Sequence, residues 1–96
     1  MTLEIANEYM IQQMTEPDHI RAHKYSSRHR ESILASESCG CFYCLRVFRP
    51  SEIKDWIDGE NTALCPKCGI DSVIGSQSGF PITKDFLNAM KIHWFG

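Results

Sequence analysis

The chain has 96 residues, of which 43% are hydrophobic and 23% charged, and its formal net charge is −2. This composition is that of a globular protein, which argues against wholesale disorder. The length suits one small domain, of a size that often needs a metal or a disulfide for stability. The slight acidity argues against broad, nonspecific nucleic-acid binding, which depends on neutralising phosphate charges.

The sequence carries no sign of export or of membrane insertion. Its start, Met1-Thr2-Leu3-Glu4, lacks the basic residues and the apolar run of a signal peptide. No stretch approaches the roughly 20 apolar residues of a membrane-spanning helix. We therefore expect a cytoplasmic protein whose five cysteines stay reduced, and a disulfide framework is the weaker interpretation.

Two helical regions are expected within residues 1–37. Apolar residues at helical spacing predict an amphipathic helix over residues 2–14, capped by Thr2. Its apolar face is a candidate docking surface or dimer seam. A second helical region covers residues 17–36, with an interruption near Ser26.

The second helical region holds the basic cluster of the chain. We interpret it first as a solvated helix face, the usual role of charged helix positions. The alternative is a contact with an anion or a nucleic acid, which the nearby Glu31 and Glu37 weaken. The candidate contact residues are Arg21, Lys24, Arg28 and Arg30.

From Ser38 the pattern changes to short elements, which is typical of a small α+β domain. We expect a short hairpin over residues 41–48 and a short strand over residues 62–64. Between them, Pro50 opens a short helix that Gly59 ends. The helix is predicted from the i, i+3, i+4 spacing of Ile53, Trp56 and Ile57.

The end of the chain is expected to form a last helix. Residues 70–74 are one helical turn or a short strand, and residues 75–81 are a loop in which Phe80 is exposed. Thr83 caps the helix. Its apolar stripe consists of Phe86, Leu87, Met90 and Trp94. Residues 38–96, which hold two Cys-x-x-Cys pairs, are expected to form a four-cysteine domain with a C-terminal helix, in one compact unit with residues 1–37.

Two Cys-x-x-Cys pairs, about twenty residues apart, are the strongest motif of the sequence. This is the spacing of a zinc site with four thiolate ligands, because each two-residue spacer makes a turn that aims both sulfurs at one ion. Zinc is favoured over a rubredoxin-like iron site, since nothing else suggests electron transfer. Four protein ligands leave no position for a catalytic water, so one Zn²⁺ per chain is expected to stabilise the fold. The predicted ligands are Cys41, Cys44, Cys65 and Cys68.

Cys39 is the fifth cysteine and precedes the first pair by two residues. The first interpretation is a bystander thiol. Two alternatives give it a function: it replaces Cys41 as a ligand on oxidation, or it acts as a redox sensor beside the metal centre.

Histidines offer a weaker enzyme hypothesis. His19 and His23 have the i, i+4 spacing of a pair of metal ligands, but they lack a third ligand. A metal-dependent nuclease would place a histidine base beside a second, open metal site. The segment between the two Cys-x-x-Cys turns, which we call knuckles, offers only Asn61 as a candidate catalytic residue. The end of the chain offers only Asn88 and His93.

Residues 62–75 (TALCPKCGIDSVIG), residues 39–44 (CGCFYC) and the closing Trp94-Phe95 resemble a family of small bacterial cytoplasmic proteins with no assigned activity. At the level of fold, the two knuckles resemble zinc-ribbon or treble-clef domains. The predicted helix between the knuckles favours the treble clef. That fold class includes nucleic-acid binders, adaptors and accessory modules of enzymes, so the resemblance implies only the four metal ligands.

The leading hypothesis is a non-enzymatic zinc-binding module that acts by binding another protein, with a homo-oligomer as a further option. Its basis is the closed metal site, the acidic net charge and the lack of a catalytic constellation. A nucleic-acid-binding zinc protein is the first alternative, and a metal-dependent nuclease is the second.

Overall fold

The computed structural model describes residues 17–96, so the helix predicted over residues 2–14 lies outside the described residues. The helical elements are α2 (Asp18–Arg21), the 3-10 helix η1 (Ala22–Ser26), α3 (Arg30–Leu34), the 3-10 helices η2 (Pro50–Glu52) and η3 (Ser76–Ser78), and α4 (Lys84–Phe95). The strands are β1 (Cys39–Cys41), β2 (Val47–Phe48), β3 (Trp56–Ile57), β4 (Thr62–Ala63) and β5 (Val73–Gly75). The protein is therefore a small mixed structure of helices and sheets, as predicted.

A three-stranded antiparallel sheet with the order β2-β1-β5 forms the centre of the protein. The β1–β2 hairpin confirms the one predicted after Ser38, with Cys39 opposite Phe48. β5 returns from far along the chain to pair with β1, and Cys41 lies opposite Val73. Of residues 70–74, which were predicted to form one helical turn or a short strand, Val73 and Ile74 belong to this strand.

The two faces of this sheet pack against different groups of apolar residues. On one face, Cys39, Cys41 and Val73 belong to a cluster that also contains Ile33, Phe48, Ile53, Ala63 and Cys65. On the other face, Ile74 packs with Ala22, Phe42, Leu87 and Met90. The alternation follows from the period of two in a strand. We call these groups the cysteine-side core and the helix-side core.

Glycines let both cores approach the sheet closely. A Cβ atom added at Gly40 would lie 2.7 Å from Leu87 Cδ1 of α4 and 3.0 Å from Ile82 Cγ2. A Cβ atom at Gly75 would collide with the Ser36 side chain and lie 3.2 Å from Ile33 Cδ1. A side chain at either position would push the covering element away from the sheet.

The predicted helix over residues 50–59 is wrong. Only Pro50–Glu52 is helical, as a 3-10 turn, and Trp56–Ile57 is strand β3, paired with β4. Trp56 lies opposite Ala63, and a turn with positive φ at Asp58, Gly59 and Glu60 joins the two strands. Cross-strand pairing thus overrides the helical spacing of the apolar residues, a spacing that short segments satisfy by chance.

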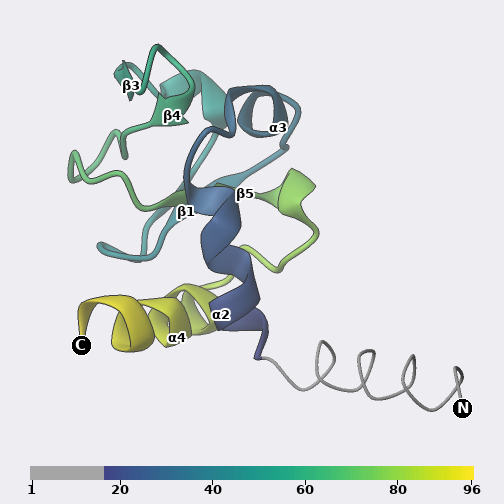
Figure 1. Ribbon diagram of the computed structural model, residues 1–96, viewed down its shortest axis with the longest axis vertical. Helices are drawn as coiled ribbons and strands as arrows, with labels where there is room; N and C mark the ends of the chain where they lie inside the picture. Colours follow the sequence, from purple (N-terminus) through teal and green to yellow (C-terminus); the bar gives the residue numbers. More distant parts are fainter. Residues whose placement is uncertain (1–16) are drawn as a thin grey trace, which may run out of the picture.

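Residues 17–36 are helical with a break, as predicted. After η1 the chain extends at Ser27, and Arg28 has a positive φ of 47° before α3 begins. Figure 1 shows α2 beside α4 at one end of the protein and α3 near the β3–β4 hairpin at the other. Within residues 17–96, no helix is long and apolar enough to cross a membrane.

The last helix begins as predicted, because the Thr83 hydroxyl accepts a hydrogen bond of 3.2 Å from the Phe86 N–H. Leu87 and Met90 are buried, whereas Trp94 at the end of the stripe is exposed. Phe80, predicted to be exposed, is partly buried and stacks on Phe86 with ring centroids 5.8 Å apart.

Candidate metal centre

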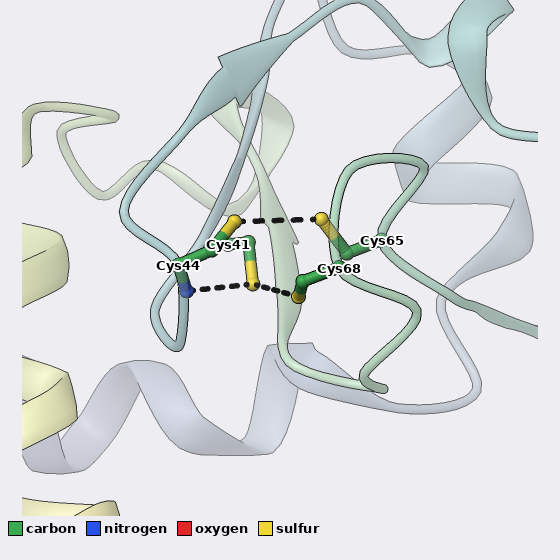
Figure 2. Close-up of side chains that lie close together, drawn as sticks. All are labelled: Cys41, Cys44, Cys65 and Cys68. Carbon is green, nitrogen blue, oxygen red and sulfur yellow. Dashed lines mark hydrogen bonds between the residues drawn. The ribbon is translucent and has the colours of Figure 1, made fainter.

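The four predicted ligands come from two turns that face each other (Figure 2). Cys41 ends β1 and Cys44 lies in the turn to β2, whereas Cys65 and Cys68 lie in the turn after β4. β5 follows the second turn and pairs with β1. The sheet therefore brings together two pairs that are far apart in the sequence.

Both turns have the same backbone pattern. The N–H of Leu45 donates to the Cys41 carbonyl at 2.8 Å, and the N–H of Gly69 donates to the Cys65 carbonyl at 2.8 Å. Leu45 and Gly69 both adopt a positive φ, of 66° and 82°. Glycine favours this left-handed conformation in the second turn, and the first turn adopts it without glycine.

The sulfur atoms are spaced as the corners of a metal-centred tetrahedron. Cys41 Sγ lies 3.6 Å from Cys68 Sγ, and Cys44 Sγ lies 3.7 Å from Cys65 Sγ. All four atoms lie within 4.8 Å of one another. A tetrahedron with metal–sulfur bonds of about 2.3 Å has edges of about 3.8 Å, so the donor set is compatible with zinc. A disulfide would bring two sulfurs to about 2.05 Å, and all four thiols are free.

Backbone N–H groups point at the sulfurs, as thiolate ligands require. Cys41 Sγ accepts hydrogen bonds from the N–H groups of Tyr43 at 3.3 Å and Cys44 at 3.5 Å. Cys65 Sγ accepts one from the N–H of Lys67 at 3.3 Å. Such donors stabilise negative charge on sulfur and fix the direction of the ligand.

Ser72 adds a side-chain contact that the spacing of the cysteines does not predict. Its hydroxyl lies 3.0 Å from Cys41 Sγ, and both groups are buried. The two residues are 31 positions apart in the sequence. No local motif indicates the contact, because the β1–β5 pairing creates it.

Burial and repulsion between neighbouring thiolates oppose the ionisation of Cys44 and Cys68. Burial raises the pKa of Cys41, but hydrogen bonds from Ser72 and from the backbone outweigh burial and leave it lowered. Burial raises the pKa of Cys68 to about 12, and the nearby Cys41 adds to the rise. The pKa of Cys44 is raised too, first by burial and then by repulsion from Cys41. A bound cation offsets both the cost of burying charged thiolates and the repulsion between them, so the four cysteines could hold a metal ion.

Cys39 lies outside this group of four. It is fully buried in the cysteine-side core, and burial raises the pKa of its thiol to about 12. A reactive thiol needs solvent access and a stabilised thiolate, and Cys39 has neither here. Its packing is that of a small apolar side chain.

The structure places the four basic residues in separate surroundings. Arg21 pairs with Asp18 at 3.1 Å and lies over the Phe80 ring, which packs on the helix-side core. Arg30 lies 4.6 Å from the ring centroid of Trp56, which packs on the cysteine-side core. Lys24 and Arg28 are exposed, as Arg21 is: Lys24 lies over the ring of its neighbour Tyr25, and Arg28 lines a shallow groove.

The histidines form no second metal site in the described part of the chain, where the four cysteines are the one group of three or more candidate ligands. His29 is buried between two backbone groups. Its Nδ1 lies 2.6 Å from the Tyr25 carbonyl, and its Nε2 accepts a hydrogen bond of 3.1 Å from the Ala63 N–H. His29 therefore has no free nitrogen for a ligand or a base.

Comparison of the chain with protein-family models, with curated protein sequences and with solved structures gave no match. The resemblance to small bacterial cytoplasmic proteins and the assignment to a zinc-ribbon or treble-clef fold stay predictions. The candidate metal centre rests on its own geometry.

Proposed function

We propose that this protein is a non-enzymatic zinc-binding module that acts by binding another protein. The observation that carries the proposal is the group of four sulfur atoms within 4.8 Å of one another. Four thiolates around one Zn²⁺ close its coordination shell, so the ion stabilises the fold without offering a position to a substrate. A site of this kind needs reduced thiols, which supports the cytoplasm as the proposed location.

The order of the strands supports a zinc-ribbon arrangement over a treble clef. The predicted helix between the knuckles was the reason to favour the treble clef, and a β-hairpin occupies its place. The ligand-bearing turns flank a three-stranded sheet, one between β1 and β2 and the other before β5. We propose that this sheet and the two turns form the zinc ribbon, with α4 packed on the opposite face.

Protein binding is supported by aromatic side chains at the surface near the end of α4. Tyr43, Trp94 and Phe95 are 42%, 39% and 45% exposed. The rings of Tyr43 and Phe95 contact each other edge to face, with centroids 4.9 Å apart. We call these three residues the aromatic patch. Exposed aromatic residues are enriched in protein interfaces, and a contiguous group of them marks an interaction surface.

Native mass spectrometry of protein purified without added metal tests the zinc site. We expect one zinc ion per chain, and we expect the Cys65→Ser variant to lose it. Cys39→Ala is the matched control, since Cys39 lies outside the group of four and this variant should keep one zinc. An iron ion in the wild type, or loss of zinc in Cys39→Ala, would contradict the assignment.

Affinity capture from a native lysate tests the function in binding. We expect a protein partner that the Phe95→Asp variant no longer retains. Val47→Asp is the control, because Val47 is 50% exposed and lies on strand β2, outside the aromatic patch. Recovery of nucleic acid without a stable protein partner would contradict the proposal and favour the nucleic-acid-binding alternative.

A further inference from the structure

A pocket of about 270 Å³ lies beside the aromatic patch, on the side of the metal centre. The elements around it are η1, the end of β1, the segment before β5 and the last turn of α4. Its main lining residues are His23, Phe42, Asp71, Ser72, Trp94 and Phe95. It differs from the metal site, but Ser72 lines it, and the Ser72 hydroxyl lies 3.0 Å from Cys41 Sγ of that site.

The aromatic walls of the pocket are held in place by their own contacts. Trp94 donates a hydrogen bond of 3.2 Å from Nε1 to the His19 carbonyl and stacks on the His23 ring, with centroids 3.9 Å apart. Phe95 packs against Phe42, with centroids 5.8 Å apart. Walls that are already fixed lose little conformational entropy when a ligand binds.

The charge of the pocket favours a cation. Asp71 is its acidic lining residue, and it makes no salt bridge among residues 17–96. Ser72, which also lines the pocket, lies 3.0 Å from Cys41 Sγ. Four thiolates exceed the charge of one divalent ion by two, so the metal centre behind Ser72 adds a negative potential when it is loaded. A phosphate or carboxylate group in the pocket would be repelled by Asp71 and by the loaded metal centre.

We propose that this pocket binds the guanidinium group of an arginine side chain on the partner protein. A guanidinium group is planar and weakly hydrated, stacks on aromatic faces and pairs with a carboxylate through two parallel N–H donors. Trp94 and Phe95, 39% and 45% exposed, supply the aromatic faces, and Asp71 supplies the carboxylate. The buried Phe42 lies beneath them and packs against Phe95. This inference rests on the proposed function in protein binding and names the chemistry of the partner.

Titration of the zinc-loaded protein with Nα-acetyl-arginine methylamide, followed by ¹⁵N-¹H correlation spectra, tests the proposal. We expect the Trp94 indole signal and the amide signals of Asp71, Ser72 and Phe95 to shift together with millimolar arginine. The alanine analogue of the probe should leave them unchanged. Absence of shifts at these positions, or tighter binding of the lysine analogue or of adenosine, would overturn the proposal.

Three variants separate a binding role from a structural one. Asp71→Asn should weaken arginine binding by about three-fold or more, as expected for loss of a partly exposed ion pair. Asp85→Asn removes the same charge about 13 Å along the α4 axis from Trp94 and should bind like the wild type. Phe95→Leu keeps an apolar side chain but loses the ring, so this variant should bind arginine about two-fold or more weakly than the wild type. Equal binding by Asp71→Asn and Asp85→Asn would overturn the proposal.

The capture experiment and the titration can fail independently. If a partner is captured but Asp71→Asn retains it fully, the pocket assignment is wrong and the function in protein binding stands. If the arginine probe binds and no protein partner exists, the function is wrong and the cation site stands.

Discussion

His29 joins α3 to the β3–β4 hairpin, and its replacement tests how this contact stabilises the fold. The side chain is 5% exposed, and its two nitrogens contact the Tyr25 carbonyl at 2.6 Å and the Ala63 N–H at 3.1 Å. His29→Leu introduces an apolar side chain of similar size and leaves both backbone groups without this partner. Each buried, unpaired group costs about 1–3 kcal/mol, so the loss of both partners should lower the free energy of unfolding by about 2–6 kcal/mol.

Urea unfolding of the zinc-loaded protein at pH 7.5, followed by tryptophan fluorescence, measures this loss. The loss is a large part of the roughly 5–15 kcal/mol that stabilises a typical domain. His93→Leu is the control, because His93 is exposed and should change stability by no more than about 0.5 kcal/mol. A His29→Leu variant within about 0.5 kcal/mol of the wild type would refute the structural role of this residue.

The pH dependence of the stability difference between the wild type and His29→Leu gives a second test of the role of His29. Burial lowers the pKa of His29, against the hydrogen bond to Tyr25 that raises it. The folded state then binds fewer protons than the unfolded state below the unfolded pKa of about 6.5. The stabilisation by neutral His29 is complete above that pH and is lost as the pH falls through the folded pKa. The stability difference between wild type and His29→Leu should therefore shrink between pH 7.5 and pH 5.5, and a constant difference would contradict this account.

Three further predictions concern the metal and the sheet. Chelation of the metal, or Cys65→Ser, should unfold the protein cooperatively by circular dichroism, since structural zinc contributes about 10–16 kcal/mol; native-like spectra without metal would contradict a structural ion. Ser72→Ala removes the hydroxyl 3.0 Å from Cys41 Sγ and should weaken zinc binding by about ten-fold in competition with a chelator, whereas unchanged affinity would show that the contact is incidental. Gly40→Ala, whose Cβ would lie 2.7 Å from Leu87 Cδ1, should lower the free energy of unfolding by about 1–3 kcal/mol with one zinc retained.

Local features of the fold were predictable from the sequence. Thr83 caps α4 because its hydroxyl accepts a hydrogen bond from the N–H three residues ahead, a contact within one turn. Gly69 adopts the left-handed conformation that the second turn requires. The break near Ser26 and the hairpin after Ser38 are also local. Each depends on residues a few positions apart, which a sequence pattern records directly.

Segments 53–57 and 70–74 could not be assigned from local pattern. Trp56 and Ile57 have helical spacing relative to Ile53, but they form a strand because Ala63 and Thr62 pair with them. Val73 and Ile74 suit a helical turn or a strand equally well. They form a strand because they pair with β1. Propensity over a few residues is worth less than the cross-strand contacts that tertiary structure supplies.

The sequence by itself determined the four candidate ligands, because the two-residue spacing inside each pair already fixes a turn that can aim two sulfurs at one ion. Only the tertiary structure brought the two pairs within 4.8 Å, through the β1–β5 pairing, and left Cys39 buried outside the group. It also decided that His29 supports the backbone, and it built the pocket lined by His23, Phe42, Asp71 and Trp94 from four separate segments. The physical reason is that ligand spacing is local, whereas burial, partners and surface depend on which distant segments meet.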